Sequence, residues 1–372
     1  MGTPRMMLHL LKIIIRQIPR PFVFMKNAIW KFCAALWRRL RSVSTFLWGY
    51  GAALRRRLQS VSTFLWGYGA QPHRLPHGLH NQGATCYLNS VLQVLVMTTE
   101  IHDRLDHDSQ TDQQLKQIFE ELKRKTCTTE TITAAFGITN VHEQRDAPEC
   151  LEMILNKISR RASEVFQGEL THTTECSKGH SINEETNPFW TLPLSLQDTH
   201  DTTYSVERSF ERIFQQKSFS GDNMVYCNEC EEKTEATSGC EMVKYPQILT
   251  LLFKRFDFDY RTMSYFKSHR CVDVPRTLQR KDKEYKLYGM VHHNGSLTGG
   301  HYTATILCSE DKTWYEFNDA HVSKVKQQPF AKTSTYKSQT AYLLMYRGKI
   351  KGAICKKSKA NSRKILLICH RD

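Results

Sequence analysis

The chain has 372 residues, of which 40% are hydrophobic and 10% are aromatic, with 18 Gly and 11 Pro. These values describe a foldable globular protein of one or two domains, and they exclude collagenous, low-complexity and wholly disordered chains. The net charge of +15 lies at the ends: residues 1–70 carry +12 and residues 347–372 carry +8, which leaves −5 for residues 71–346. We therefore expect no nucleic-acid partner for the folded body.

A tandem duplication marks the N-terminal part. Residues 56–70 repeat residues 38–52 at an offset of 18, with Gln59 in place of Arg41 as the one difference. Each copy joins arginines to aromatic residues, which is typical of a segment at an anionic membrane surface. A poorly ordered extension and a transit peptide are the alternatives. No spanning helix and no cleavable signal peptide are predicted, so we expect reduced thiols and a cytoplasmic or nuclear protein, with membrane-surface contact through residues 1–70.

The composition changes near Pro72 and Pro76, where acidic residues and regular apolar patterns begin. We predict a basic N-terminal extension over residues 1–74, a folded domain over residues 77–348 and a basic tail over residues 349–372. A nuclear address and a solvated tail are both open interpretations of the last segment.

Hydrophobic periodicity predicts helices first and strands later in the folded domain. Apolar residues recur every three or four positions from Leu88 to Val96, which predicts a helix over 86–97. The other predicted helices span 111–125 and 147–160, and the predicted strands span 245–256, 285–292, 302–307, 314–317 and 340–346. This order indicates an α+β fold.

Cys86 would lie in the first turn of the first helix, where unpaired backbone N–H groups and the helix dipole favour a thiolate. It is therefore a candidate nucleophile, and a buried structural thiol is the alternative. Residues 78–93 read GLHNQGATCYLNSVLQ. This stretch resembles the cysteine box of the ubiquitin-specific proteases, GLxNxGxTCYxNSxLQ.

A second block resembles the histidine box of that family, HxG…GHY…WYxFND: it reads HNG at residues 293–295, GGHY at 299–302 and WYEFND at 314–319. The resemblance implies that His301 is the general base and that Asn318 orients it, with Asp319 adjacent. Which of these last two matters more stays open. It also implies that the amide of Asn81 stabilises the oxyanion, whereas a loop-capping asparagine is the alternative reading.

A third block, EQRDAPECL at residues 143–151, resembles the family's QQDAxEFL helix start. The acidic residues that match this pattern are Asp146 and Glu149. The resemblance implies that they hold the basic C-terminal tail of ubiquitin. Gln144 and Tyr302 are assigned to substrate binding with them. Read without the family, the acids would satisfy a helix dipole.

A zinc site is a further candidate, because a CxxC pair lies in the β-rich part. Family members with zinc carry a second CxxC, whose last cysteine is replaced here by Gly179. A histidine one residue further on could supply the missing ligand, and a vestigial site is the alternative. The candidate ligands are Cys176, His180, Cys227 and Cys230.

The resemblance covers residues 77–348 and implies a papain-like fold with thumb, palm and fingers. It implies a monomeric, thiol-dependent deubiquitinase that acts on ubiquitin and ubiquitinated proteins and needs no cofactor for catalysis. A protease for another ubiquitin-like modifier and a catalytically silent ubiquitin-binding scaffold are the alternatives. Retention of Cys86, His301 and Asn318 favours the enzyme.

Overall fold

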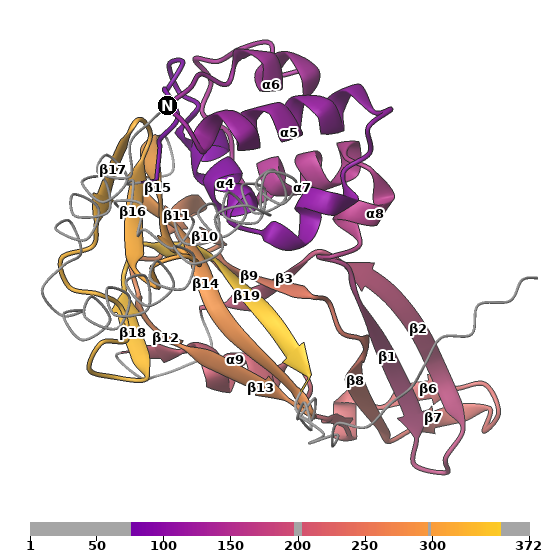
Figure 1. Ribbon diagram of the computed structural model, residues 1–372. Coiled ribbons are helices and arrows are strands. Elements are labelled where there is room, and N and C mark those ends of the chain that lie inside the picture. The colour runs from indigo at the N-terminus through magenta and orange to yellow at the C-terminus, as the bar shows by residue number, and fades with distance from the viewer. Residues whose placement is uncertain (1–75, 197–202, 297–298, 351–372) are drawn as a thin grey trace, which may run out of the picture. The chain divides into compact units, whose positions relative to one another are not determined.

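The computed structural model describes residues 76–196, 203–296 and 299–350. The duplicated N-terminal extension and the basic tail beyond residue 350 lie outside the described residues. Helices occupy the first part of the described chain and strands the second (Figure 1), so the predicted α+β class is confirmed. Within the described ranges, no helix is long and apolar enough to cross a membrane.

A layer of helices forms the first part. Its segments are α4 (Cys86–Val96), η2 (Thr99–Arg104), α5 (Gln110–Leu122), α6 (Glu130–Ala135), α7 (Ala147–Lys157) and α8 (Arg160–Ser163). The helices predicted over 86–97 and 111–125 are confirmed as α4 and α5. The helix predicted over 147–160 is confirmed only as far as Lys157, because Ile158 has an extended backbone and α8 is a separate turn.

The helix α4 is the centre of this layer, and its residues from Cys86 to Leu95 are all buried. It packs against β15 and β14 of the large sheet on one side and against α7 on the other. A helix with neighbours on two sides has no solvent face, so even its polar residues Asn89, Ser90 and Gln93 are buried.

The large sheet has eight strands, with the order β17-β16-β15-β14-β19-β9-β3 and β13 paired to β14. Its strands are β3 (Thr191–Ser195), β9 (Ile248–Lys254), β13 (Thr277–Arg280), β14 (Lys283–Gly295), β15 (Gly300–Leu307), β16 (Trp314–Asn318), β17 (His321–Lys324) and β19 (Ala341–Ile350). Each of the five predicted strands overlaps one of these. The strand predicted over 245–256 is observed as the shorter β9, which begins at Ile248 and ends at Lys254.

Both faces of this sheet are covered. The helical layer packs on one face together with Val291 and Leu343, while Met290 and Leu344 belong to the core of the opposite face. Successive side chains of a strand point to opposite faces, so β14 and β19 supply both cores. The second face carries α9 (Val206–Arg212) and a small sheet of β4 (Thr203–Ser205), β12 (Cys271–Pro275) and β18 (Thr335–Ser338).

A second, four-stranded sheet with the order β2-β1-β8-β5 extends away from the cores. Its strands are β1 (Gly168–Cys176), β2 (Ser181–Phe189), β5 (Lys217–Phe219) and β8 (Ala236–Lys244), and the segments at its tip are η3 (Gly221–Asn223), β6 (Val225–Cys227) and β7 (Glu232–Thr234). Seven of the nine residues of β2 are exposed, so no alternating pattern marks it in the sequence. The helices, the large sheet and this extension correspond to the expected thumb, palm and fingers.

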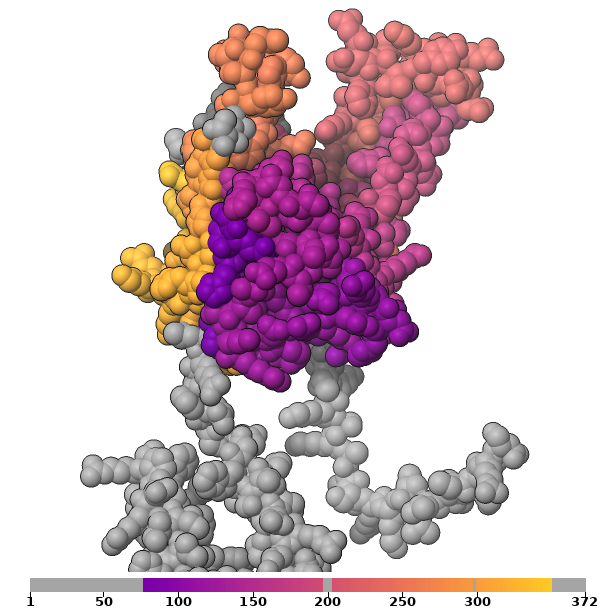
Figure 2. Space-filling view, turned by 90° about the horizontal axis from the view of Figure 1, so that it is seen from above, coloured from indigo at the N-terminus to yellow at the C-terminus, as the bar shows by residue number. Residues whose placement is uncertain are grey.

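A separate hairpin of β10 (Phe256–Asp259) and β11 (Ser264–Lys267) projects from the base of the large sheet. Figure 2 shows an open notch between this hairpin and the four-stranded extension, with the helical layer in front.

One close contact joins the start of the described chain to the turn after β16. The backbone N–H of Leu79 donates to the carbonyl of Asp319, and a Cβ built on Gly78 would lie 2.3 Å from that same carbonyl oxygen. Asp319 itself has a φ of 50°, a conformation that L residues seldom adopt. Only glycine permits this approach of two backbones.

We expect Gly78→Ala to lower the free energy of unfolding by about 1–3 kcal/mol, because the added methyl overlaps backbone atoms that cannot rotate away. Urea denaturation of the two proteins measures the difference. Gly299→Ala is the matched control, since its Cβ would meet nothing within 4 Å. Equal destabilisation by both substitutions would contradict the role of this contact.

Candidate active site

Cys86 is the first residue of α4 and is 3% exposed. Burial raises the pKa of its thiol, and the carboxylate of Asp319 adds to the rise. The backbone N–H of Tyr302 and the side chain of Gln144 lower it in part, the latter through Nε2 at 3.6 Å from the sulfur. The net shift is upward, so the thiolate expected at the helix start is not favoured in this structure.

His301 lies at the start of β15 and contacts the end of β16. Its Nε2 is 2.7 Å from Oδ1 of Asn318 and 4.0 Å from Oδ2 of Asp319. Because an amide oxygen only accepts hydrogen bonds, Nε2 carries the proton of the neutral ring and Nδ1 is left unprotonated. Of the two candidates for orienting His301, Asn318 therefore makes the direct hydrogen bond.

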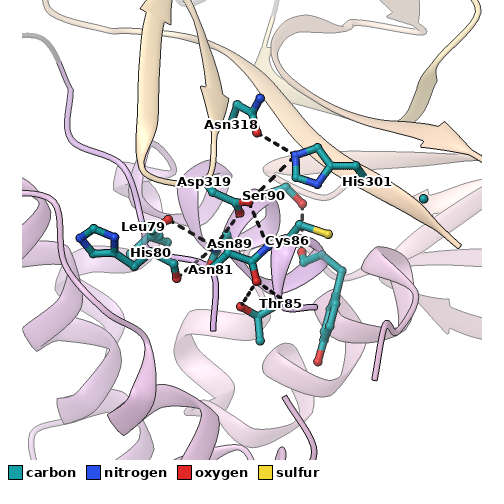
Figure 3. A network of polar contacts seen from close by, with 12 residues as sticks. Leu79, His80, Asn81, Thr85, Cys86, Asn89, Ser90, His301, Asn318 and Asp319 are labelled. Atoms are coloured by element: carbon teal, nitrogen blue, oxygen red, sulfur yellow. Dashed lines mark hydrogen bonds and ion pairs between the residues drawn. The ribbon is translucent and has the colours of Figure 1, made fainter. Parts of the chain in front are cut away.

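Contacts on both sides of His301 bring Cys86 to it. The sulfur accepts from the N–H of Tyr302, which follows His301. Gln144 touches the same sulfur and binds Gly300, which precedes His301, through two hydrogen bonds of 2.6 and 2.9 Å. In Figure 3 the sulfur lies below the imidazole. The structure thus brings the predicted nucleophile and base together from segments more than two hundred positions apart.

The carboxylate of Asp319 links the two halves of the site. Oδ2 accepts from Nδ2 of Asn81 at 3.0 Å, and Oδ1 accepts from Nδ2 of Asn89 at 2.7 Å. Figure 3 shows these side chains converging below His301. Hydrogen bonds to a charged acceptor stabilise by about 1.5–3 kcal/mol each, so this joint fixes the loop before α4 against the turn after β16.

Asn81 also organises its own loop. Its Oδ1 accepts hydrogen bonds from the backbone N–H groups of Gly83 and Thr85, at 2.9 and 3.0 Å, and from the hydroxyl of Thr85 at 3.2 Å. The loop-capping role that the sequence left open is therefore present. The amide nitrogen points away from these contacts, toward Asp319.

The two acids of the third block have different surroundings. Asp146 is the N-cap of α7, and its carboxylate accepts from the hydroxyls of Tyr302 at 2.8 Å and Tyr342 at 2.9 Å. Burial raises the pKa of this carboxyl, although the tyrosines partly oppose the rise. Glu149 lies one turn further along and is exposed. The structure therefore does not present the two carboxylates as an equal pair.

A pocket of about 240 Å³ opens beside Cys86 and His301. Its walls come from the α7 start, the hairpin base and the end of β14, and the lining residues are Gln144, Arg145, Asp146, Phe256, His293, Ser296, Gly299 and Tyr302. Three of the four residues predicted to bind substrate line it, and Glu149 does not. The lining carries one acidic side chain, Asp146, and one basic side chain, Arg145.

The four candidate metal ligands do meet, at the tip of the four-stranded extension. Their ligand atoms lie within 4.8 Å of one another, with Nδ1 of His180 3.2 Å from the sulfur of Cys230 and 3.7 Å from that of Cys227. The sulfur of Cys176 is 4.0 Å from that of Cys230. In a tetrahedral site with metal–sulfur bonds of about 2.3 Å the sulfur atoms lie about 3.8 Å apart, which is close to these separations, so small side-chain adjustments let this set hold a metal ion.

Two residues of the site were not singled out from the sequence. Asn89 binds Asp319, and Tyr342 binds Asp146. A signal existed for each, because Asn89 lies within the cysteine box, one helical turn after Cys86, and Tyr342 lies in the predicted last strand. Their roles depend on partners distant in the chain, which spacing alone does not reveal.

Comparison with known proteins gives a consistent result. The sequence model of a family described as ubiquitin carboxyl-terminal hydrolase matches residues 77–346. The chain is similar to ubiquitin carboxyl-terminal hydrolase 47 of Xenopus tropicalis and of Homo sapiens, each 26% identical, with 73% of this chain covered and 28% or 27% of the relative. It is 28% identical to ubiquitin carboxyl-terminal hydrolase 15 of Schizosaccharomyces pombe, over 66% of this chain and 24% of that protein. The chain thus spans about a quarter of the length of these curated relatives.

We expect the rate at which iodoacetamide alkylates Cys86 to keep rising above about pH 8, because the thiolate is the reactive form and burial raises the pKa of this thiol. Mass spectrometry of the peptide that contains Cys86 measures the rate at each pH, and Cys86→Ser is the control for the labelled position. A rate that is constant between about pH 6 and pH 9 would contradict this assignment.

Proposed function

Because the chain belongs to the ubiquitin carboxyl-terminal hydrolase family, we propose that it is a cysteine-type deubiquitinase that hydrolyses the bond after the C-terminal glycine of ubiquitin. The observation that carries the proposal is the position of Cys86. Its sulfur accepts from the N–H of Tyr302, which follows His301, and lies 3.6 Å from Nε2 of Gln144, which binds Gly300, the residue before His301. The hydrogen bond from His301 to Asn318 supports it, since an oriented imidazole is what a thiol nucleophile needs.

The reaction begins with a neutral thiol. Nδ1 of His301 accepts the proton of Cys86, and the resulting thiolate attacks the carbonyl carbon of the terminal glycine. A carbon–sulfur bond forms while the carbonyl electron pair moves to oxygen. The tetrahedral intermediate then collapses, the bond to the lysine amine breaks, and His301 returns its proton to the departing amine.

Water completes the cycle. His301 takes a proton from a water molecule, whose oxygen attacks the carbonyl carbon of the thioester. The carbon–sulfur bond then breaks, His301 returns its proton to the sulfur, and the carboxylic acid of ubiquitin loses its proton to solvent. Throughout, Asn318 holds Nε2 so that Nδ1 faces the reacting atoms. Transfer of the thiol proton when substrate excludes water is compatible with the raised pKa of Cys86, because the imidazolium formed at His301 stabilises the thiolate.

Asn81 is the proposed oxyanion donor. One hydrogen of its amide is bound by Asp319, and the carboxamide oxygen is held by the loop, so the remaining amide hydrogen has a fixed direction. A preorganised donor of this kind contributes about 10²–10³ in rate. Asp319 then acts through Asn81 and Asn89 rather than through direct contact with His301.

The pocket beside Cys86 is the proposed site for the tail of ubiquitin. Gln144 spans its inner end, and Tyr302 and Asp146 form one wall. Glu149, exposed three residues after Asp146 on α7, is proposed to offer its carboxylate to a basic residue of the tail. Asp146 contributes to binding of the tail through its negative charge and through the hydroxyl groups of Tyr302 and Tyr342 that it binds.

We expect Cys86→Ala to reduce turnover of a ubiquitin C-terminal fluorogenic amide by about 10³-fold or more, because the substitution removes the thiol that attacks the carbonyl carbon. Release of the fluorophore measures this. Cys240→Ala, a change on β8 in the extension, is the matched control and should retain full turnover.

Two outcomes would count against the proposal. Wild-type protein that binds ubiquitin but leaves the amide intact would be the silent scaffold considered from the sequence. Faster cleavage of the same reporter on another ubiquitin-like modifier would reassign the substrate.

We propose that the four candidate ligands at the tip of the extension, Cys176, His180, Cys227 and Cys230, hold a zinc ion with a structural role. Three thiolates and one imidazole form the donor set that zinc prefers, and the cluster joins β1 to the β6–β7 turn at the tip of the extension. Bound there, zinc would fix the far wall of the notch. Catalysis itself requires no metal in this mechanism.

We expect about one zinc ion per chain, and we expect His180→Ala to lose most of it, because a site with three ligands in place of four binds far more weakly. Elemental analysis of the purified protein gives the zinc content. His172→Ala is the matched control, since His172 lies on β1 of the same extension but its ring faces Cys240 rather than the candidate metal ligands. Equal zinc in the two variants would rule His180 out as a ligand.

The surroundings in which the enzyme works remain those inferred from the sequence. We propose a monomer in the cytoplasm or nucleus that acts on ubiquitinated proteins, with contact to a membrane surface through residues 1–70. The charge and aromatic content of the duplicated segment support the membrane contact.

A further inference from the structure

A lysine at the base of the β10–β11 hairpin is the feature that the mechanism above does not use. Lys267 is the last residue of β11 and is partly buried. Its ammonium lies 5.8 Å from the centre of the Phe256 ring, and Phe256 lines the pocket. The hairpin tip beyond it is exposed and aromatic, with Tyr260 81% and Tyr265 69% exposed.

The ammonium of Lys267 contacts the end of β14 in the large sheet. Nζ donates to the backbone carbonyls of His293 and Gly295, each at 2.9 Å. Both carbonyls belong to the last residues of β14. Lys267 is therefore a bridge between the hairpin and the end of a core strand.

The two carbonyls flank the residue that is paired with the general base. In the β14–β15 register, Asn294 is opposite His301, and Gly295 is opposite Gly300. The position of His301 along and above the sheet is set through this pairing. Fixing residues 293–295 consequently fixes the strand against which His301 is registered.

This stretch of β14 is also held by the ring of His293, whose centroid lies 5.4 Å from that of Phe256 on the hairpin side. It is the last paired segment before the turn, and Gly295 adopts a φ of 117° with its Cα side packed so closely that a Cβ would lie 2.5 Å from Gly300. On the other side, the N–H of His293 donates to Thr340 at 2.8 Å. The ammonium supplies a matching restraint from the hairpin side.

The cation is held without a counter-charge. Burial lowers the pKa of Lys267 to about 8, and the buried guanidinium of Arg255 adds to the effect, while within the described residues no carboxylate forms an ion pair with it. The imidazole of His293 is also close, and burial lowers its pKa to about 4, so it is neutral. An unpaired, partly buried ammonium is stable only where carbonyl oxygens and a ring face replace its water, which ties Lys267 to this one position.

We propose that Lys267 is a positioning residue for the hydrolysis: its ammonium holds the end of β14 so that His301 is aligned with Cys86. The inference rests on the proposed function, because alignment matters only if His301 acts as the base. It assigns to Lys267 an effect on the chemical step rather than on substrate binding, since a small displacement of a catalytic group can lower the rate by up to about 10²-fold.

The test uses the full chain and the ubiquitin C-terminal fluorogenic amide. Lys267→Met keeps the apolar stem and removes the ammonium, and Lys267→Arg keeps a cationic donor. We expect Lys267→Met to lower kcat by about tenfold with KM within about twofold, and we expect Lys267→Arg to recover at least about half of the wild-type kcat. Lys254→Met, at the exposed end of β9, is the matched control and should leave both constants unchanged.

Each outcome decides between the alternatives. An unchanged kcat in Lys267→Met, or a raised KM with unchanged kcat, overturns the positioning role while the wild-type turnover still supports the proposed function. Absence of turnover in the wild type refutes the proposed function itself. If Lys267→Met unfolds near the assay temperature, Lys267→Gln replaces it, because the shorter neutral amide cannot reach both carbonyls, and the same criteria apply.

Discussion

The carboxylate of Asp319 joins the helix that carries Cys86 to the sheet that carries His301. It accepts the amides of Asn81 and Asn89, and its own backbone carbonyl accepts the N–H of Leu79. These are three restraints between segments about 230 positions apart, and two of them are hydrogen bonds to a charged group. The strained φ at Asp319 and the lack of a side chain at Gly78 are the backbone conditions for this joint.

The polar residues around this joint have different contacts and therefore different roles. Asn318 faces His301 directly, so it sets the tautomer, whereas its neighbour Asp319 faces the loop and the helix and sets their distance. Gln144 makes the equivalent connection on the other side, from the α7 start to Gly300. Cys86 is thereby enclosed by groups that are each fixed by another part of the fold, which is how preorganisation is obtained without a bound substrate.

Burial and hydrogen bonding shift the pKa values of Cys86 and Asp146 in opposite directions. The same packing that positions Cys86 raises the pKa of its thiol, and the same burial raises the pKa of Asp146 while keeping it bound to two tyrosines. On the hairpin side, Arg255 is fully buried and donates to three backbone carbonyls, those of Ala341, Ser268 and Arg270. Arg255 therefore places a positive charge under the hairpin side, whereas Asp146 places a carboxyl group at the α7 start.

Sequence patterns alone predicted the fold class, the helix that begins at Cys86, five strands of the large sheet, and most of the residues that meet at the site. They could do so because apolar periodicity and the short boxes around Cys86, His301 and Asp146 are local properties. They could not separate Asn318 from Asp319, find the partners of Asn89 and Tyr342, or detect β2, whose residues are exposed on both faces. Those features depend on which distant group lies within about 3 Å of a side chain, and on how much water is excluded around it, and both are decided only when the helices and the sheet pack together.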